Sequence, residues 1–320
     1  TVAVNWDAWR EVGMAVDAAR QRGAVEQSAA APQAVTASQY REIAHPLFER
    51  FMRDAHESDI YVTRFGVPRS WVLNEHRVNG RPTLPGTAYL ELARAAYEMH
   101  LADVRPIELR DVAFLSPLAV EDGHEREVRT VLRRTGQGEE CEFTIVSRPD
   151  PARDYWQEHA RGRLAPLPMT PPARHDIERF LGNTPLVFNE HQIANRPRPI
   201  EFGPRWQNLG QVRFGRNQGL ALIRLPDAFE GDLDTFMLHP ALLDSASGFV
   251  AVQNPGHYLP FAYRRVRILR PLPRSLYSYA AFEQVLVGGR QRLHLNLTVM
   301  DTSGVVVLEM EDYVLVKVTT

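Results

Sequence analysis

The sequence predicts an α+β fold in which an antiparallel sheet packs on one central helix, and it predicts this arrangement twice. The segment 87–100 has a helical pattern and is followed by a run of strand candidates. A proline-rich break at 166–172 then interrupts the chain, and more strands and a second helix follow it. One helix combined with a run of strands is typical of an antiparallel sheet with a helix across one face. A length of 320 residues also suits two units of about 150 residues each.

The first predicted unit spans 45–165. Pro85 and Gly86 punctuate the chain just before the helix, whose large and small apolar residues recur at i, i+3 and i+4 spacing. The residues of this face are Tyr89, Leu92, Ala93, Ala96 and Tyr97. Strands bounded by Gly, Pro and charged turns are expected at 109–118, 126–134, 140–147 and 155–164.

The second predicted unit spans 186–320 and follows a linker at 166–185. Two strands precede a helix that starts at Pro240 and ends near Val252, and four strands follow it. The expected strands are 209–216, 219–225, 264–270, 276–287, 291–301 and 304–318. Near the N-terminus, the stretch 23–44 is expected to be another linker, because most of it is rich in Ala, Gln and Ser without an apolar period.

The bulk composition argues against several classes of function. The net charge is −2, so no global excess of positive charge indicates binding to nucleic acid or to a membrane surface. No apolar run approaches the roughly 20 residues that span a bilayer. The single cysteine, Cys141, excludes an internal disulfide, and its glutamate neighbours make it a poor nucleophile. No HxxxH or HExxH spacing indicates a metal site. We therefore expect a soluble, cytoplasmic protein without nucleic-acid, membrane or metal partners.

Two phrases contain the candidate catalytic residues. The first runs from His76 to Pro85 and has the form HxxxGxxxxP, with Gly80 at its centre. The second is Leu238-His239-Pro240-Ala241-Leu242-Leu243-Asp244. A histidine and a carboxyl group can share base and acid work on one substrate. Because His76 and Asp244 are far apart in the sequence, only a fold that brings the two units together can pair them.

Five phrases, in this order, resemble those of the dehydratase domains of polyketide synthases, which have a double hot-dog fold. The resemblance extends from His45 to the C-terminus. Its phrases are HxxxGxxxxP at 76–85, the last strand of the first hot dog at 156–164, GYxYGPxF around 202–206, DxxxQ/H after Asp244, and LPFxW at 259–263. The resemblance implies two curved antiparallel sheets, each wrapped around a central helix, with the active site where the two hot dogs meet.

This resemblance implies syn elimination of water from a β-hydroxyacyl thioester on an acyl carrier protein. His76 would take the C2 proton, and the Asp244 carboxyl would protonate the departing hydroxyl. Asp244 must then hold a proton, so an apolar pocket should raise its pKa. No metal or organic cofactor is implied beyond the phosphopantetheine arm that carries the substrate. Other implied partners are neighbouring synthase domains and a second copy of the chain.

The phrases also assign residues to the substrate site and differ from the family pattern at three places. The expected substrate-binding residues are Gly80, Pro85, Gly86, Thr87, Phe202, Gly203, Pro204, Trp206, Gly248 and Phe261. Both tyrosines of GYxYGPxF are missing around Phe202, Gly248 replaces the polar residue four positions after Asp244, and Tyr263 replaces the last tryptophan of LPFxW. The loss of a hydrogen-bond partner at a buried carboxyl costs about 1–3 kcal/mol. This interaction would otherwise fix the orientation or the pKa of the carboxyl.

The first residues resemble a different domain. Val2-Ala3-Val4-Asn5-Trp6, followed by 7–15, is similar to the closing strand and loop of polyketide-synthase ketoreductase domains. We therefore expect 1–22 to be the C-terminal remnant of a ketoreductase domain.

Two rival functions remain open. One uses His76 and Asp244 for isomerisation, cyclisation or epimerisation of the acyl chain, and the other is a non-catalytic scaffold. A basic run beside the LPFxW-like phrase is expected to be a solvated strand edge, with docking of an acidic carrier protein as the alternative. Its members are Arg264, Arg265, Arg267, Arg270 and Arg274.

Overall fold

The structure is a computed structural model that describes residues 40–149, 155–189, 192, 200–254 and 257–318. The expected ketoreductase remnant at 1–22 and most of the expected linker at 23–44 lie outside these residues. Within the described ranges, no helix is long and apolar enough to cross a membrane.

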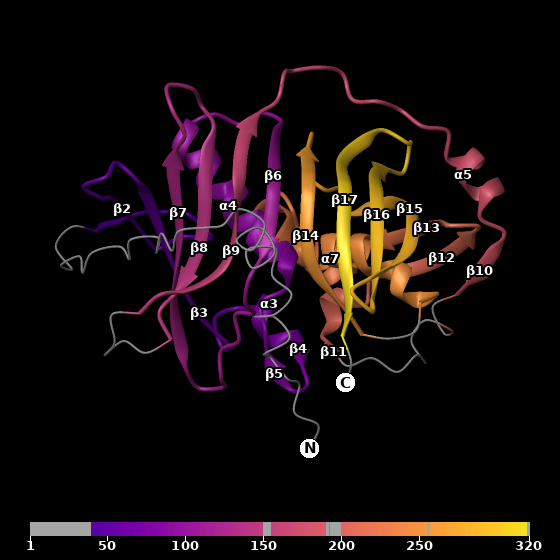
Figure 1. The fold of residues 1–320 in the computed structure, drawn as a ribbon, viewed down its shortest axis with the longest axis horizontal. Helices are drawn as coiled ribbons and strands as arrows, with labels where there is room; N and C mark the ends of the chain where they lie inside the picture. The colour runs from indigo at the N-terminus through magenta and orange to yellow at the C-terminus, as the bar shows by residue number, and fades with distance from the viewer. Residues whose placement is uncertain (1–39, 150–154, 190–191, 193–199, 255–256, 319–320) are drawn as a thin grey trace.

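Fourteen of the described strands form one continuous antiparallel sheet with two equal halves (Figure 1). The halves join edge to edge, because β6 pairs with β14 from Ile107↔Ile268 to Ala113↔Ala262. In sheet order, the strands of the first half are β1 (Arg41–Glu42), β2 (Arg50–Arg53), β3 (Asp59–Gly66), β7 (Glu125–Arg134), β8 (Cys141–Ser147), β9 (Gln157–Pro166) and β6 (Ile107–Phe114). The strands of the second half are β14 (His257–Ile268), β17 (Val306–Val318), β16 (Arg290–Asp301), β15 (Ser275–Val287), β13 (Gln218–Arg224), β12 (Leu209–Gly215) and β10 (Leu186–Phe188).

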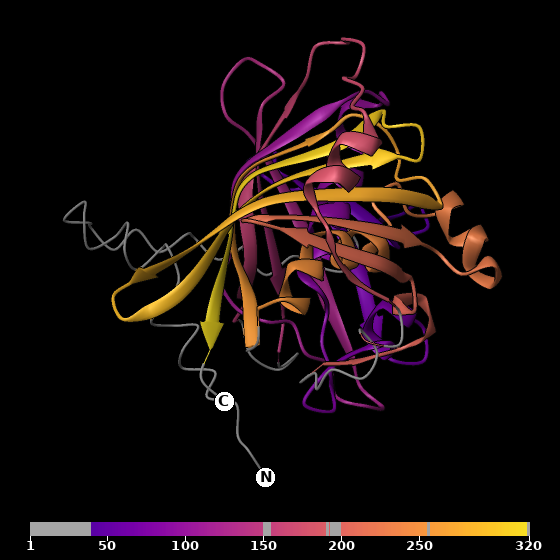
Figure 2. The ribbon, with the colours of Figure 1, turned by 90° about the vertical axis from the view of Figure 1, so that its right-hand side faces the viewer.

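Each half of the sheet curves around one central helix, as Figure 2 shows. Helix α4 (Gly86–Leu101) packs on β7, β8 and β9, and α7 (Pro240–Gly248) packs on β13 and β15. The predicted apolar face of α4 is fully buried, and the two helices also contact each other. Burial of such a face against a sheet supplies most of a helix's stability. The predicted arrangement of a helix wrapped by an antiparallel sheet therefore occurs in both halves.

A small second sheet links the two halves at the end where the catalytic phrases lie. It consists of β11 (Ile200–Phe202), β4 (His76–Val78) and β5 (Arg81–Pro82), in this order. Since β11 belongs to the second half of the chain and β4 to the first, their pairing connects the halves directly. Helix α3 (Trp71–Asn74) contacts β4. Further short helical segments are η2 (Pro204–Trp206), η3 (Asp227–Asp234) and η4 (Phe249–Val252).

The observed elements differ from the predicted ones in several details. The predicted helix 240–252 ends as an α-helix at Gly248 and continues as the 3₁₀ segment η4. Strands β2 and β3 were not predicted, although β3 is among the most buried strands. Two described elements lie within segments that were expected to be linkers: β1 within 23–44 and helix α5 (Ile177–Asn183) within 166–185. The α5 helix begins where the Asp176 side chain accepts a hydrogen bond from the Glu178 amide.

Cys141 lies at the start of β8 and is fully buried. Burial raises the pKa of its thiol to about 11, so the thiolate form is disfavoured near neutral pH. This placement agrees with the expectation that Cys141 is a poor nucleophile.

Candidate active site

His76 is the first residue of β4 and is held by a backbone carbonyl. Its side chain is buried, and its Nδ1 lies 2.7 Å from the carbonyl oxygen of Thr83, seven residues further along the same phrase. A carbonyl oxygen can only accept, so Nδ1 carries the proton of the neutral ring. Nε2 therefore keeps its lone pair and can act as a base.

Asp244 lies on α7, and its carboxyl faces both His76 and an indole. Trp206 Nε1 donates a hydrogen bond of 2.8 Å to Asp244 Oδ2. Burial raises the pKa of Asp244, while the positive charge available at His76 and the Trp206 hydrogen bond lower it, and burial prevails. The direction agrees with the expectation that this carboxyl holds a proton more readily than an ordinary aspartate. The structure thus brings His76 and Asp244, which belong to different halves of the chain, into one site.

Trp206 connects the two candidate catalytic residues. Its ring centroid is 5.7 Å from the His76 ring, and its indole N–H reaches Asp244. Phe202 stacks on Trp206 at 5.8 Å and lies 5.7 Å from the His76 ring. Phe202 and His76 are also direct partners in the β11–β4 pairing. Trp206 was expected only to line the substrate site, and its hydrogen bond to Asp244 is an additional role.

A close backbone approach explains the glycine and proline of this phrase. The Gly203 amide donates to the carbonyl oxygen of Glu75 at 2.8 Å. A Cβ atom at Gly203 would lie 2.3 Å from Glu75 Cγ, so no larger residue fits without movement. Pro204 is the first residue of η2, a position where its fixed φ is favourable. Both residues therefore place Trp206 beside the strand of His76.

Behind the pair lies a connected chain of charged and polar side chains that the sequence did not reveal. The Arg205 guanidinium pairs with Glu75, and its Nε lies 2.6 Å from Asp232 Oδ2. That oxygen is 3.5 Å from His239 Nε2. Burial alone raises the pKa of Asp232, but its contacts with His239 and Arg205 outweigh burial and hold this pKa below its ordinary value.

His239 begins the helix of Asp244. Its Nδ1 accepts a hydrogen bond from the Leu242 amide at 3.3 Å, which satisfies one of the free N–H groups at the start of α7. His239 therefore supports the start of the helix that bears Asp244. The ring also stacks on Trp71 at 5.1 Å, and Trp71 meets Trp206 edge-on at 6.0 Å.

The start of α4 reaches the start of α7. The hydroxyl of Thr87 donates to the carbonyl oxygen of Pro240 at 3.0 Å, which ties the two central helices together. Pro85 precedes α4 and has no side-chain acceptor, so the first N–H groups of this helix remain available to a ligand. Gly86 lies close to Phe114 and Pro260, where an added Cβ would be 3.2 Å from the Phe114 ring.

Comparisons with known proteins identify the family of this chain. A family model described as polyketide synthase dehydratase domain matches residues 45–148, and one described as polyketide synthase dehydratase N-terminal domain matches 194–320. Together they cover well over half of the chain. The chain belongs to the polyketide synthase dehydratase family.

Individual relatives support this assignment. The polyketide synthase PksM of Bacillus subtilis is 28% identical over 86% of this chain, which spans only 7% of that relative's length. The dehydratase domain from the CurF module of curacin polyketide synthase is 25% identical and has a TM-score of 0.74, covering 86% of this chain and 100% of that domain. A dehydratase domain of the CurJ module has a TM-score of 0.76 at 20% identity, covering 86% of this chain and 96% of that one. The double hot-dog fold expected from the sequence is therefore confirmed.

Three of the expected substrate-site residues have surroundings different from those of the candidate pair His76 and Asp244. Gly80 forms the exposed turn between β4 and β5 with a φ of +77°, which favours glycine. Gly248 ends α7, and nothing lies within 4 Å of the position that its Cβ would take. Phe261 packs in a small cluster with Val314, separate from the main core.

The residue of the LPFxW-like phrase that lies near Asp244 is Tyr263. Its ring is buried and stacks on Tyr313 at 4.2 Å. Burial raises the pKa of Tyr263, and the negative charge of Asp244 raises it further. Leu242 and Leu243, which immediately precede Asp244, are completely buried.

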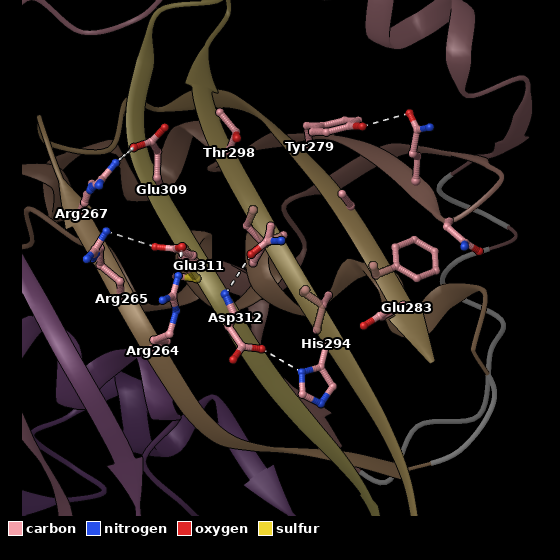
Figure 3. A pocket seen from close by; sticks show the side chains of 18 of the residues that line it. Arg264, Arg265, Arg267, Tyr279, Glu283, His294, Thr298, Glu309, Glu311 and Asp312 are labelled. Carbon is pink, nitrogen blue, oxygen red and sulfur yellow. Dashed lines mark hydrogen bonds and ion pairs between the residues drawn. The ribbon is translucent and has the colours of Figure 1, made fainter. Parts of the chain in front are cut away.

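Three members of the basic run, Arg264, Arg265 and Arg267, lie on β14 and line a hollow of about 880 Å³ (Figure 3). Arg270 and Arg274 follow the end of this strand. Carboxylates on the neighbouring strand β17 pair with the members on β14: Glu311 binds Arg264 and Arg265, and Glu309 binds Arg267. The patch is thus largely neutralised. The expectation of a strand edge is wrong, because β14 pairs with β6 on one side and with β17 on the other. The arginines on β14 instead belong to a charge-balanced, solvated surface in the interior of the sheet, which gives no support to carrier-protein docking at this run.

Proposed function

We propose that this chain catalyses syn elimination of water from a β-hydroxyacyl thioester carried on an acyl carrier protein. The observation that carries the proposal is the convergence of His76 and Asp244 at the joint between the two hot dogs. One has a free ring nitrogen, and the other has a raised carboxyl pKa. Membership of the dehydratase family supports the same reaction. The product is an α,β-unsaturated acyl chain, and no metal or organic cofactor is required.

His76 acts as the base. Its Nε2 takes a proton from C2, and the electron pair of that C–H bond forms the C2–C3 double bond as the C3–O bond breaks. The hydrogen bond from Nδ1 to Thr83 fixes both the tautomer and the ring orientation. The buried carbonyl also stabilises the proton that stays on Nδ1 once the ring becomes positively charged.

Asp244 acts as the acid. Hydroxide is a poor leaving group, so the carboxyl proton moves to the departing oxygen and water is released. Trp206 occupies Oδ2, which leaves Oδ1 to carry the transferable proton. After elimination His76 is protonated and Asp244 is ionised. Transfer of one proton from His76 to Asp244 through solvent restores the starting state.

The start of α4 stabilises the thioester oxygen. Negative charge develops on this oxygen as the C2 proton leaves, and amide N–H groups at a helix N-terminus stabilise such charge. Gly86 and Thr87 provide the first amides of α4, close to the start of α7. The hydroxyl of Thr87 is already engaged with Pro240, so we assign the stabilising role to the backbone.

Mass spectrometry of the acyl carrier protein tests the reaction. A β-hydroxyacyl chain on its phosphopantetheine arm should lose the mass of one water when the wild-type chain is added. Chromatography of the released acyl group then identifies the unsaturated product. A product of unchanged mass but altered retention would instead support isomerisation, epimerisation or cyclisation by the same pair. An unchanged substrate across several chain lengths would support the scaffold hypothesis.

A further inference from the structure

We propose that Arg205 is a positioning residue that sets the separation of His76 and Asp244, an inference that rests on the proposed dehydration. Arg205 is the centre of a chain of polar contacts, Glu75–Arg205–Asp232–His239, which we call the clamp. One end of the clamp adjoins His76, and the other begins the helix of Asp244.

The first end of the clamp fixes the strand of the base. Glu75 immediately precedes His76, and its side chain is only 9% exposed. It accepts two hydrogen bonds from Arg205, one from the backbone amide at 2.9 Å and one from the guanidinium. A buried carboxylate bound in this manner has little freedom to move, so the backbone at His76 is held against η2.

The second end fixes the helix of the acid. Arg205 Nε donates to Asp232 at 2.6 Å, and Asp232 faces the His239 ring. That ring is completely buried and caps α7 through Leu242. Asp244 lies on the same short helix, little more than one turn after His239. A movement of Asp232 is therefore passed to the orientation of Asp244.

The guanidinium itself has little room to move. It lies 4.4 Å from the Trp71 ring and 4.2 Å from the Phe229 ring, and its side chain is 16% exposed. Such a planar group can bind two carboxylates at once and stack on aromatic faces, whereas a lysine ammonium cannot do both. Since Arg205 also precedes Trp206, the same residue positions the donor to Asp244.

Stability alone does not explain this arrangement. A buried ion pair stabilises a fold little more than apolar residues of similar volume, because both charges lose their hydration. Both carboxylates that bind Arg205 lie next to a segment that bears a proposed catalytic group. Glu75 immediately precedes His76, and Asp232 contacts His239, which begins the helix of Asp244. A role of the clamp in holding His76 and Asp244 at a fixed separation explains why both carboxylates occur at these positions.

The test compares Arg205→Lys and Arg205→Met with wild type, using Arg133→Lys and Arg133→Met as matched controls. Arg133 forms an exposed pair with Glu142 at 2.7 Å on β7 and β8, away from the site. We expect kcat for dehydration to fall about 100-fold in the Arg205 variants at little change in KM, since a misplacement of about 1 Å costs that much. The Arg133 variants should keep the wild-type kcat.

Hydrogen exchange of the Trp206 indole N–H provides a second measurement that does not need activity. This N–H, identified by its absence in Trp206→Phe, should be protected in wild type and exchange faster in Arg205→Lys. If Arg205→Met does not fold, Arg205→Lys decides the question. A folded Arg205→Lys with wild-type kcat and wild-type indole protection would overturn the proposal. If the wild type does not dehydrate the β-hydroxyacyl substrate, the proposed function is wrong. The exchange rate of the Trp206 indole N–H then decides by itself whether Arg205 positions the site.

Discussion

Replacing Trp206 by phenylalanine removes the indole donor to Asp244 and keeps an aromatic ring in contact with Phe202. A hydrogen bond to a charged group contributes about 1.5–3 kcal/mol, and a pKa shift of one unit corresponds to about 1.4 kcal/mol. Because this bond stabilises the ionised carboxylate, its loss should raise the pKa of Asp244 by about one to two units. Burial already raises this pKa, so the variant carboxyl should stay protonated to a distinctly higher pH.

The pH dependence of kcat/KM measures this effect. Asp244 must be protonated to act as the acid, so activity falls as pH rises through the pKa of the coupled His76–Asp244 pair. In Trp206→Phe this fall should begin at a pH about one to two units higher than in wild type. Trp156→Phe is the control, since Trp156 lies against Arg129 and away from the pair. A high-pH limb that is unchanged or moves to lower pH would refute the assigned role of Trp206.

Three further perturbations have defined outcomes. Gly203→Ala should lower both the melting temperature and kcat, because its methyl group would lie 2.3 Å from Glu75 Cγ; wild-type values of both would contradict the close approach. Thr87→Val should lower the free energy of unfolding by about 1–3 kcal/mol in urea titrations, since it leaves the Pro240 carbonyl oxygen without its buried donor. Burial lowers the pKa of His159 to about 4, so the unfolded chain takes up a proton below about pH 6.5 while the native chain does not. The stability contributed by the neutral ring is complete above pH 6.5, and up to about 3 kcal/mol is lost as the pH falls toward 4. In urea titrations, His159→Gln should weaken the dependence of the free energy of unfolding on pH, whereas His124→Gln, at an exposed position, should not. An equal pH dependence in both variants would contradict the prediction.

Many helices and strands were predictable from local sequence patterns, because each depends mainly on residues close to it in the sequence. The i, i+3, i+4 spacing of 87–100 and the alternation in strands such as 276–287 depend on near neighbours only. Strand β3 was not predicted although it is well buried, because its sequence does not alternate between apolar and polar residues. The seven-residue helix α5 was missed because its cap signal at Asp176 lies within a proline-rich stretch.

The site was predictable only in part. The phrases around His76 and Asp244 and their family resemblance identified the candidate pair. Adjacency could have indicated Glu75 and Arg205, since they immediately precede His76 and Trp206. No sequence signal indicated Asp232, because its contact with Arg205 depends on how η3 packs against η2. Interactions across such separations are set by tertiary packing rather than by local pattern.

The neutralised basic run illustrates the same limit. The sequence shows arginines in succession on β14, but their glutamate partners lie on β17, more than 40 residues later. Cross-strand pairing decides whether such a run is a positive patch or a balanced surface. That pairing appears only when the strand order is known.

The central claim is that His76 and Asp244 act as one unit on one substrate. Its most direct test is the rate of water loss from a β-hydroxyacyl carrier protein in wild type, His76→Ala, Asp244→Asn and the double variant, followed by mass spectrometry. Each single change should abolish nearly all elimination, and the double variant should be no slower than the slower single variant, as for residues that work together. A single variant that retains the wild-type rate, or a double variant slowed by the product of both single effects, would contradict the claim.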